Sequence, residues 1–344
     1  MVTDNPGSFR LICERPSSLR SLLRTAVLGF LILTIVVSTF QPASAQANDD
    51  RAEILPFRAS TSEIPTRQLI KSNVNLVLVD VTVLDRWDRT VTGLETSDFT
   101  VLEDNTRQAI RYLSAVDQPI SLVIVFDASA SMATKIQAER RAVAELINSS
   151  NPQDEFTVIV VQSKPAVIFQ SGDPGSDLQR RIELIQPEGF TALWDGMYLA
   201  LNGLQAARYQ RKAIVLISDG GNNHSRYTQS EIKSQLEEAD VEVYALGIFD
   251  RFAKRIEEKS GPLQLDEVAS VTGGRMFSVH DRAEISHAVA QISSELRNQY
   301  MLGYYSGNRD CNGKWRKVKI RLAGSAAASK LRVYARKGYY APAN

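Results

Sequence analysis

The sequence predicts an α/β fold in which helices cover both faces of a doubly wound, mostly parallel β-sheet. Apolar runs such as SLVIVFD, FTVIVVQS and KAIVLISD alternate with helix-like segments between residues 119 and 300. Strands that are apolar along their whole length are typical of a parallel sheet that is buried on both faces. The regions before and after this unit contain short strand-like pieces without such helices, which predicts flanking β segments.

Each expected element of the α/β unit follows from its own pattern. Apolar strands are expected at 121–127, 156–163, 212–219, 241–249 and 275–279, with a short antiparallel partner at 166–170. Helices are expected between them at 135–148, 191–208, 230–240, 265–274 and 281–300. In the first of these helices, apolar residues recur on one side, as in a helix that packs on a sheet: Ile136, Val143, Leu146 and Ile147.

The flanks are rich in β-type sequence on both sides of this unit. Strand-like pieces occur within residues 69–118, beginning with NVNLVLVDVTVLD, and again within residues 301–344, in MLGYYS, KWRKVKIRLA and LRVYARKGYYA. A block of about 50 residues is too small to be a confident domain by itself. We therefore expect the two flanks to pack together as one accessory β module, with the α/β unit of residues 119–300 inserted between them.

The N-terminus has the pattern of an export signal. Basic residues precede the uncharged apolar run AVLGFLILTIVVSTF at 26–40, which is short for a membrane span, and Ala43-Ser44-Ala45 fits a small-residue cleavage site. We expect residues 1–45 to be a signal peptide and the polar residues 46–68 to be a linker. The alternative is an uncleaved membrane anchor. The mature protein is thus expected to be exported, either periplasmic or secreted, and membrane-bound only if this segment is retained.

Composition excludes several classes of function. The formal net charge of the chain is +1, and no basic block or basic-aromatic stripe is present, so nucleic acid is not an expected partner. The three histidines and two cysteines show no zinc-ligand spacing. Cys13 lies in the expected signal, so Cys311 is expected to stand alone in the mature chain.

Oxygen-bearing side chains gather where the expected strands end. Asp127, Ser129 and Ser131 follow the first strand of the unit, Asp219 ends the strand KAIVLISD, and Thr191 lies in a loop before a helix. In an open parallel sheet, ligands bind at the carboxyl ends of the strands, where the strand order reverses. Hard cations such as Mg²⁺ take oxygen ligands and keep waters. The alternative is that these residues only cap helices, as Ser, Thr and Asp often do.

These residues carry a resemblance to a known family. DASAS resembles the D-x-S-x-S signature of von Willebrand factor type A (VWFA) domains, whose metal-ion-dependent adhesion site also uses a Thr and a later Asp. The flanks, including GLETSDFTVLED and RKGYYA, resemble the exported VWFA-related domain family described in Acidobacteria. Two positions depart from the pattern. Phe190 stands where related loops often have Gly before the Thr, and Asp88 stands in a turn where Gly is usual.

The resemblance implies a metal site and a way of using it. Ser129, Ser131 and Thr191 would contact one ion, Mg²⁺ or alternatively Mn²⁺ or Ca²⁺, while Asp127 and Asp219 would act mostly through bound water. An Asp or Glu of a protein partner would take the remaining position. The resemblance thus implies an exported, metal-dependent adhesion module that captures an acidic residue of its partner.

Other classes of function remain open. The chain could be a structural component of an envelope assembly in which the metal site is vestigial. An enzyme is not expected. A haloacid dehalogenase-type site needs a second Asp where Ser129 stands, and no G-x-S-x-G frame surrounds the serines.

Three residue groups near the site have competing interpretations. Asp195 is expected to be a first-turn acid of a helix rather than a ligand. Trp194 and Tyr198 are expected to face the core rather than to anchor a partner. The stretch Asn222 to His224 either takes part in recognition or is a solvated polar loop.

Overall fold

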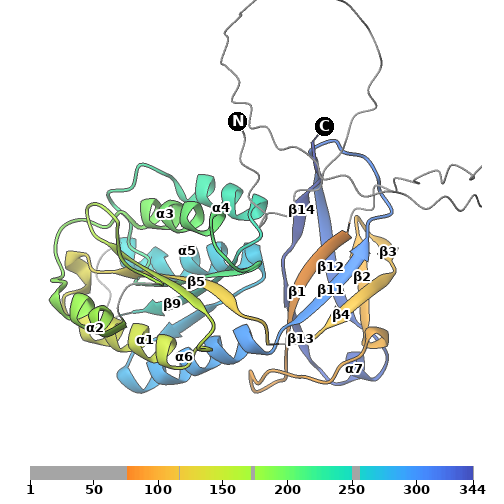
Figure 1. Cartoon of the computed structure of the whole chain (residues 1–344), viewed down its shortest axis with the longest axis horizontal. Coiled ribbons are helices and arrows are strands. Elements are labelled where there is room, and N and C mark those ends of the chain that lie inside the picture. The colour runs from red at the N-terminus through yellow and green to blue at the C-terminus, as the bar shows by residue number, and fades with distance from the viewer. Residues whose placement is uncertain (1–75, 116, 172–174, 250–255, 344) are drawn as a thin grey trace, which may run out of the picture. The chain divides into compact units, whose positions relative to one another are not determined.

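The computed structural model of the chain describes residues 76–115, 117–171, 175–249 and 256–343, which belong to one compact unit (Figure 1). The expected signal of residues 1–45 and the expected linker of residues 46–68 lie outside these ranges. Within the described ranges, no helix is both long and apolar enough to cross a membrane.

The centre of the α/β unit is a six-stranded sheet with the order β10-β9-β8-β5-β6-β7. All its neighbouring strands pair in parallel except β7, which is antiparallel to β6. This confirms the predicted mostly parallel sheet and its short antiparallel edge. Its strands are β5 (Ile120–Asp127), β6 (Glu155–Val161), β7 (Ala166–Gln170), β8 (Arg211–Ser218), β9 (Glu242–Ile248) and β10 (Met276–Val279).

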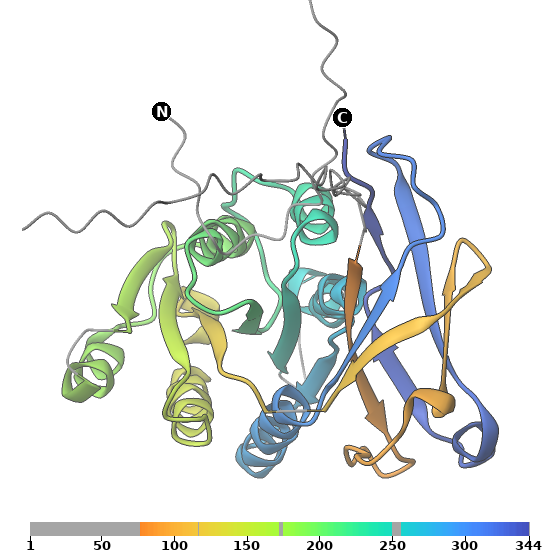
Figure 2. The same ribbon diagram turned by 45° about the vertical axis from the view of Figure 1, so that its right-hand side comes forward.

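Helices cover both faces of this sheet, as Figures 1 and 2 show. Buried residues of α1, α2 and α6 belong to the apolar core on one face, and those of α3, α4 and α5 to the core on the other. The helices are α1 (Ile136–Asn148), α2 (Gly175–Leu184), α3 (Leu193–Gln205), α4 (Gln229–Glu238), α5 (Ile256–Thr272) and α6 (Arg282–Arg297). Packing on both faces holds the sheet in place, and the loops at its carboxyl edge are therefore held at fixed positions.

Two helices differ from the sequence expectation. The sequence analysis did not predict α2, a mostly polar helix in which Leu178 and Ile182 are the buried apolar residues. Helix α5 starts nine residues earlier than expected, because Gly261 and Pro262 lie inside it. Glycine and proline are normally helix breakers, so this stretch did not have a helical pattern.

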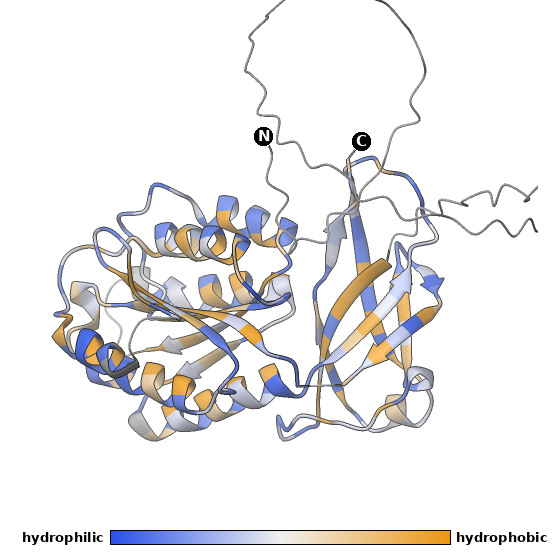
Figure 3. Ribbon diagram, viewed as in Figure 1, coloured by the Kyte–Doolittle hydropathy of each residue, from blue (hydrophilic) through white to orange (hydrophobic). Residues whose placement is uncertain are grey.

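The apolar strands of the sheet are buried on both sides. All eight residues of β5 are buried. Leu122, Ile124 and Phe126 pack into one core, while Val123 and Val125 pack into the other. Figure 3 shows the same concentration of hydrophobic residues on the central strands. Burial on both faces of the sheet, as predicted, thus explains the continuous apolar pattern of these strands.

The flanking segments form two four-stranded sheets with the orders β13-β1-β11-β4 and β14-β12-β2-β3. Each sheet combines strands from both ends of the chain, which confirms that the flanks pack together. Val79, Val81, Tyr300 and Leu302 are among the residues of their shared core. The strands are β1 (Leu76–Leu84), β2 (Phe99–Glu103), β3 (Thr106–Gln108), β4 (Ile110–Ser114), β11 (Tyr300–Tyr305), β12 (Trp315–Leu322), β13 (Arg332–Ala335) and β14 (Gly338–Tyr340).

The last β segment is divided, although the sequence suggested one strand. Its first part, β13, pairs with β1, and its second part, β14, pairs with β12 in the other sheet. The chain crosses between the sheets at Arg336 and Lys337. A short helix, α7 (Gly324–Ala328), precedes β13.

Cys311 is disulfide-bonded in the full-length chain, whereas the expectation that it stands alone concerns the mature chain. The chain has two cysteines, and Cys13 belongs to the segment that we expect to be cleaved. The expectation of a single cysteine therefore applies only to the processed protein.

A buried polar network joins the α/β unit to the β segments. Arg211, at the start of β8, donates to the Gln118 carbonyl at 3.0 Å and to Gln299 Oε1 at 2.7 Å. Gln299 Nε2 in turn donates to Thr82 Oγ1 of β1 at 3.1 Å and to Glu242 Oε2 of β9 at 2.6 Å. These bonds link β8 and β9 of the six-stranded sheet to β1 of a flanking sheet, so the two parts meet in specific contacts.

Asp88 has a structural reason to replace the glycine that is usual in its turn. Its φ is 61°, a left-handed conformation that Asp tolerates better than most residues. Its carboxylate accepts from Arg275 of the α/β unit at 2.9 Å and from Arg332 of β13 at 2.6 Å. An aspartate therefore adds two ion pairs that glycine cannot make.

We expect the two parts to differ in their ability to fold alone. A fragment of residues 120–300 should give a cooperative thermal transition by circular dichroism, because it contains the whole six-stranded sheet and its helices. A fragment of residues 46–118 should not give such a transition. It contains β1 but lacks β11 and β13, the strands that pair with β1 on either side. A cooperative transition of residues 46–118 by themselves would contradict the shared β module.

The polar network also predicts a pH dependence of stability. Burial, together with the charge of Asp80, raises the pKa of Glu242 to about 7 from its usual 4.5, although Gln299 opposes the shift. The folded state therefore favours the protonated carboxyl. This contribution is complete below about pH 4.5 and is lost as the pH rises through 7.

Glu242→Gln replaces the ionisable carboxyl of the network with an amide that is neutral at every pH. We expect the variant to be about 1–2 kcal/mol more stable than the native chain at pH 8 and equal to it near pH 4.5, allowing for partial exposure. Urea unfolding at several pH values measures this. Glu238→Gln, at an exposed position on α4, is the control. Equal pH profiles for native chain and Glu242→Gln would show that Glu242 is ionised in the fold.

Candidate metal centre

The candidate site lies where the order of the strands reverses. The chain continues from β5 to β6 and β7 on one side, and from β8 to β9 and β10 on the other. Asp127 is the last residue of β5, and Asp219 directly follows β8, its neighbour in the sheet. The two carboxylates thus flank the switch point at the carboxyl edge, where open α/β sheets bind ligands.

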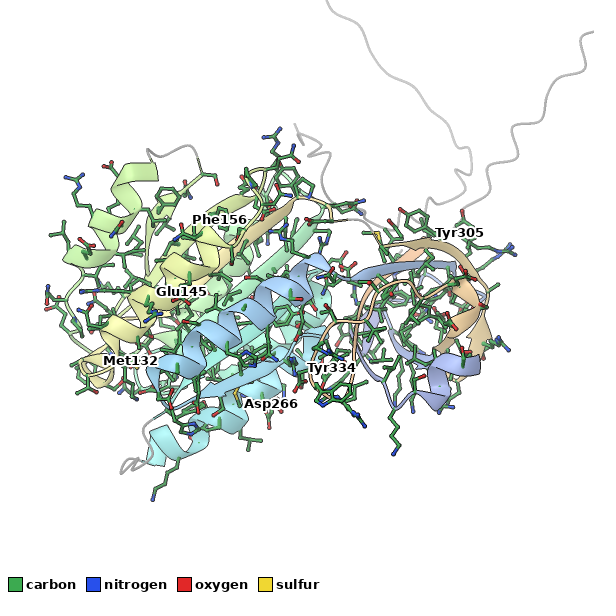
Figure 4. All side chains as sticks on the ribbon, turned by 90° about the horizontal axis from the view of Figure 1, so that it is seen from below. Met132, Glu145, Phe156, Asp266, Tyr305 and Tyr334 are labelled. Atoms are coloured by element: carbon green, nitrogen blue, oxygen red, sulfur yellow. The ribbon has the colours of Figure 1, made fainter. Side chains whose placement is uncertain are left out.

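The first loop of the site is held by its own side chains. The backbone N–H of Ser129 donates to Asp127 Oδ1 at 2.9 Å, and the hydroxyl oxygens of Ser129 and Ser131 lie 3.1 Å apart. Ser131 lies in a single 3-10 turn, η2 (Ala130–Met132), and Met132 is fully buried below it. Figure 4 shows Met132 at the end of the α/β unit that lies far from Tyr305 of β11. The buried methionine therefore anchors the loop to the core.

The second loop fixes Asp219. Its Oδ1 accepts from the Gly221 N–H at 3.0 Å, and its Oδ2 accepts from Lys135 Nζ at 3.1 Å. Gly220 has a φ of 78° and lies against Gly261 of α5, where a Cβ on Gly220 would come within 2.5 Å of the Gly261 Cα. Only glycine fits there, since a side chain would be both strained and obstructed. This close packing sets the position of Asp219.

The third loop brings Thr191 to the same edge. The Thr191 N–H donates to Asn223 Oδ1 at 2.9 Å, and the Thr191 carbonyl accepts from the N–H groups of Asn223 and His224. On its other side, this loop is bonded to the first loop, through Glu188 N–H to the Ala128 carbonyl at 3.0 Å. All five predicted ligands therefore lie on loops that are hydrogen-bonded to one another.

Helix α3, which follows Thr191, is capped by a different segment of the chain. Its N-cap position is Ala192, which has no side chain that could accept a hydrogen bond. Instead, Asn222 Oδ1 accepts from the Leu193 N–H at 3.1 Å, and Ser225 Oγ accepts from the Trp194 N–H at 3.0 Å. The loop after Asp219 thus satisfies the free amides of α3 and ties its start to the site.

The carboxylates of the site are buried close together. Asp127 is fully buried and Asp219 is 1% exposed. Burial, with the added charge of Asp219, raises the pKa of Asp127 to about 6, although hydrogen bonds from Ser129 and Ser218 oppose the shift. The Ser218 hydroxyl donates to Asp127 Oδ2 at 2.8 Å. The site therefore holds more negative charge than its surroundings stabilise.

The residues around the site have clear positions. Asp195, in the first turn of α3, is buried and accepts from the Arg226 N–H at 2.8 Å, so it anchors the loop that contains Arg226. As expected, Trp194 lies in the core and Tyr198 packs against the same core, partly buried and stacked on Tyr227. His224 stacks on Phe190, whose side chain is 59% exposed beside Thr191.

Sequence reasoning missed several supporting residues. The asparagines at 222 and 223 were expected to be either recognition or solvated loop residues, but their side chains bond inward to the start of α3 and to Thr191. Lys135 and Ser218 were not singled out, although both bond the site's carboxylates. A lysine eight residues after a loop aspartate has no local signature, since its partner is 84 residues away.

The side chains at this edge fit a hard cation. They offer only oxygen, from two carboxylates and three hydroxyls. Within the described residues, no three His, Cys, Asp or Glu side chains come together as a metal site, so ligation here depends on the hydroxyls. Ser129 Oγ and Ser131 Oγ lie 3.1 Å apart. Adjacent oxygen ligands of an octahedral Mg²⁺ are about 2.9 Å apart, given bond lengths of about 2.05 Å.

Comparison with known proteins shows a similarity of part of the α/β unit to a known family. Residues 122–222 match the family model of the von Willebrand factor type A domain. An uncharacterized protein, sll0103, from Synechocystis sp. is 22% identical over 185 residues, which cover 52% of this chain and 42% of that protein. The chain thus spans less than half the length of this relative.

Two solved structures show similarity of the fold at low identity. A von Willebrand factor type A protein from Catenulispora acidiphila is 12% identical and has a TM-score of 0.45. The match covers 78% of this chain and 73% of that protein's chain. Proximal thread matrix protein 1 from the mussel byssus, solved with a zinc-occupied MIDAS motif, is 20% identical and has a TM-score of 0.44. The match covers 56% of this chain and 49% of that protein's chain.

The shared cap of α3 predicts a measurable loss of stability. Asn222→Ala removes the acceptor for the Leu193 N–H, and losing such a cap costs about 1 kcal/mol. Urea unfolding should show this decrease. Asn148→Ala, at an exposed position on α1, is the control and should change stability by less than about 0.5 kcal/mol. If both variants were equally stable, the loop would not cap α3 in solution.

Proposed function

We propose that this von Willebrand factor type A domain protein is a metal-dependent binding module that captures an acidic residue of a protein partner through one divalent cation. The ion would be Mg²⁺, with Mn²⁺ or Ca²⁺ as alternatives. The observation that carries the proposal is the convergence of Asp127, the two serines, Thr191 and Asp219 on three mutually bonded loops at the switch point of the sheet.

Electrostatics support a bound cation. Two buried carboxylates at one edge repel each other, and the raised pKa of Asp127 reflects both its burial and the charge of Asp219. Lys135 supplies one positive charge, at the Oδ2 atom of Asp219. A divalent ion would stabilise the remaining negative charge, since a buried charge is costly unless it is paired.

The side chains divide the work of holding such an ion. The hydroxyls of Ser129, Ser131 and Thr191 would contact it directly, since these short side chains are neutral and lie at the edge of the sheet. Asp127 and Asp219 would act mostly through bound water, because their oxygens already accept hydrogen bonds from the protein. The bound ion would supply an electrophilic position for a carboxylate from outside.

The rim of the site supports recognition of a protein surface. Phe190 and His224 stack with their ring centroids 5.1 Å apart, directly beside Thr191. An exposed aromatic pair next to a cation provides an apolar contact for residues that flank the partner's Asp or Glu. Phe190 thus narrows the approach to the ion and adds a contact that glycine would not offer.

We favour binding over catalysis. A nucleophilic serine needs a base within hydrogen-bonding reach. The Ser129 hydroxyl bonds the Ser131 hydroxyl, whereas the bond to Asp127 comes from the Ser129 backbone N–H, and His224 is stacked on Phe190 at the rim. The N-terminal pattern supports action outside the cytoplasm, as a periplasmic or secreted protein, or as an anchored one if the signal is retained.

A second candidate is a structural component of an envelope assembly in which the metal site is vestigial. The Lys135–Asp219 ion pair favours it, because an ammonium group already neutralises one carboxylate. Such a protein would fold and bind its partner without metal. The two candidates therefore differ in their response to chelation.

Asp127→Ala should abolish cation binding. Isothermal titration of Mg²⁺ or Mn²⁺ into chelator-treated residues 46–344 should give saturable binding to the native chain and none to the variant. A cation that binds only the folded state should also stabilise the native chain by about 2.7 kcal/mol at a hundredfold excess over its dissociation constant. The variant should show no such shift.

Asp266→Ala is the control for that experiment. Asp266 is an exposed carboxylate on α5, so its loss should leave the titration unchanged. Equal cation binding by the native chain and Asp127→Ala would contradict the proposed site. Absence of binding in both would favour the structural candidate.

A further inference from the structure

A third carboxylate lies beneath the candidate site, on the face of α1 that packs against the sheet. Glu139 is in the first turn of α1 and is fully buried. It is three residues after Ile136 and four before Val143, which belong to the apolar core on this face. An apolar residue is expected at this position of an amphipathic helix. Burial here therefore distinguishes Glu139 from an ordinary first-turn acid on a helix surface.

Glu139 has no hydrogen-bond partner that would explain its burial. Among the buried side chains that the structure describes, both of its carboxylate oxygens are without a hydrogen bond. Burial strongly raises the pKa of Glu139, and the charges of Asp127 and Asp219 raise it further. Lys135 and the Asp127 backbone oppose this rise in the pKa. The groups that act on Glu139 are thus those of the candidate metal site.

The carboxylates at this edge outnumber the positively charged groups that act on them. Asp127, Asp219 and Glu139 bring three carboxylates, and Lys135 brings one ammonium group. If a bound divalent cation kept all three carboxylates ionised, its two positive charges would neutralise the two negative charges that Lys135 does not offset. The three carboxylates do not converge closely enough to ligate one ion directly. Glu139 therefore has to act at a distance or through water.

We infer that Glu139 is a positioning residue of the cation site, which accepts hydrogen bonds from water bound to a divalent ion and raises the affinity for that ion. This inference rests on the proposed function. A third carboxylate near the ion would also change the balance between binding of the ion and binding of the partner. A third carboxylate keeps the ion bound without a partner, whereas it weakens the attraction of the ion for the partner's Asp or Glu.

The inference predicts two opposite effects of Glu139→Gln. In chelator-treated protein, the variant should melt at a higher temperature than the native chain, because a buried unpaired carboxylate is removed. In titrations with Mn²⁺, the variant should bind about tenfold or more weakly, as is typical when a residue that supports metal ligands is changed. A residue needed only for packing would not raise the melting temperature and weaken Mn²⁺ binding together.

The controls separate this inference from the function on which it rests. Glu145→Gln makes the same change on the same helix, where Glu145 is paired with Arg141, and should neither raise the melting temperature nor weaken Mn²⁺ binding. Glu139→Leu fills the site with an apolar side chain and should reproduce both effects. If the native chain binds Mn²⁺ and Glu139→Gln binds it equally, the inference is wrong while the proposed function stands.

Two further outcomes would overturn the inference. If Glu139→Gln and Glu139→Leu are both less stable than the metal-free native chain, then Glu139 stabilises the fold rather than the cation. If the native chain does not bind Mn²⁺, the proposed function fails and the inference fails with it.

Discussion

The burial of Asp127 beside Asp219 is the constraint on which the rest of the site depends. β5 and β8 are neighbouring parallel strands, so the residues at their carboxyl ends lie side by side. Placing acids at both positions concentrates negative charge where the sheet excludes water. Lys135 offsets part of it. The proposed divalent cation would stabilise the charge that remains at this edge.

The loops are organised to maintain this unfavourable arrangement. Gly220 packs on Gly261 without space for a side chain, which fixes Asp219 against α5. The Asn222 and Asn223 side chains tie the start of α3 and Thr191 to the same loop. Hydrogen bonds across three loops resist the repulsion between the acids, so the ligands are positioned before an ion binds. Preorganisation of this kind is what gives a metal site its affinity.

Sequence patterns predicted the sheet well because burial on both faces leaves an unmistakable run of apolar residues, as in β5. They also predicted that the five candidate ligands lie at one edge, since the carboxyl ends of neighbouring parallel strands lie there. Helix α2 was missed because it buries few apolar residues, and α5 was shortened because Pro262 suggests a break. Lys135 bonds Asp219 and Asn222 bonds the start of α3 across long stretches of sequence, and no local pattern reports such contacts.

The most direct test of the central claim is a crystal structure of residues 46–344 soaked in Mn²⁺, with anomalous diffraction recorded to locate the metal. The account predicts a single strong anomalous peak at the carboxyl edge of the sheet, about 2.0–2.4 Å from Ser129 Oγ and Ser131 Oγ. Bound water should separate the ion from Glu139. The absence of a peak at this edge, with Mn²⁺ present at saturating concentration, would contradict the account.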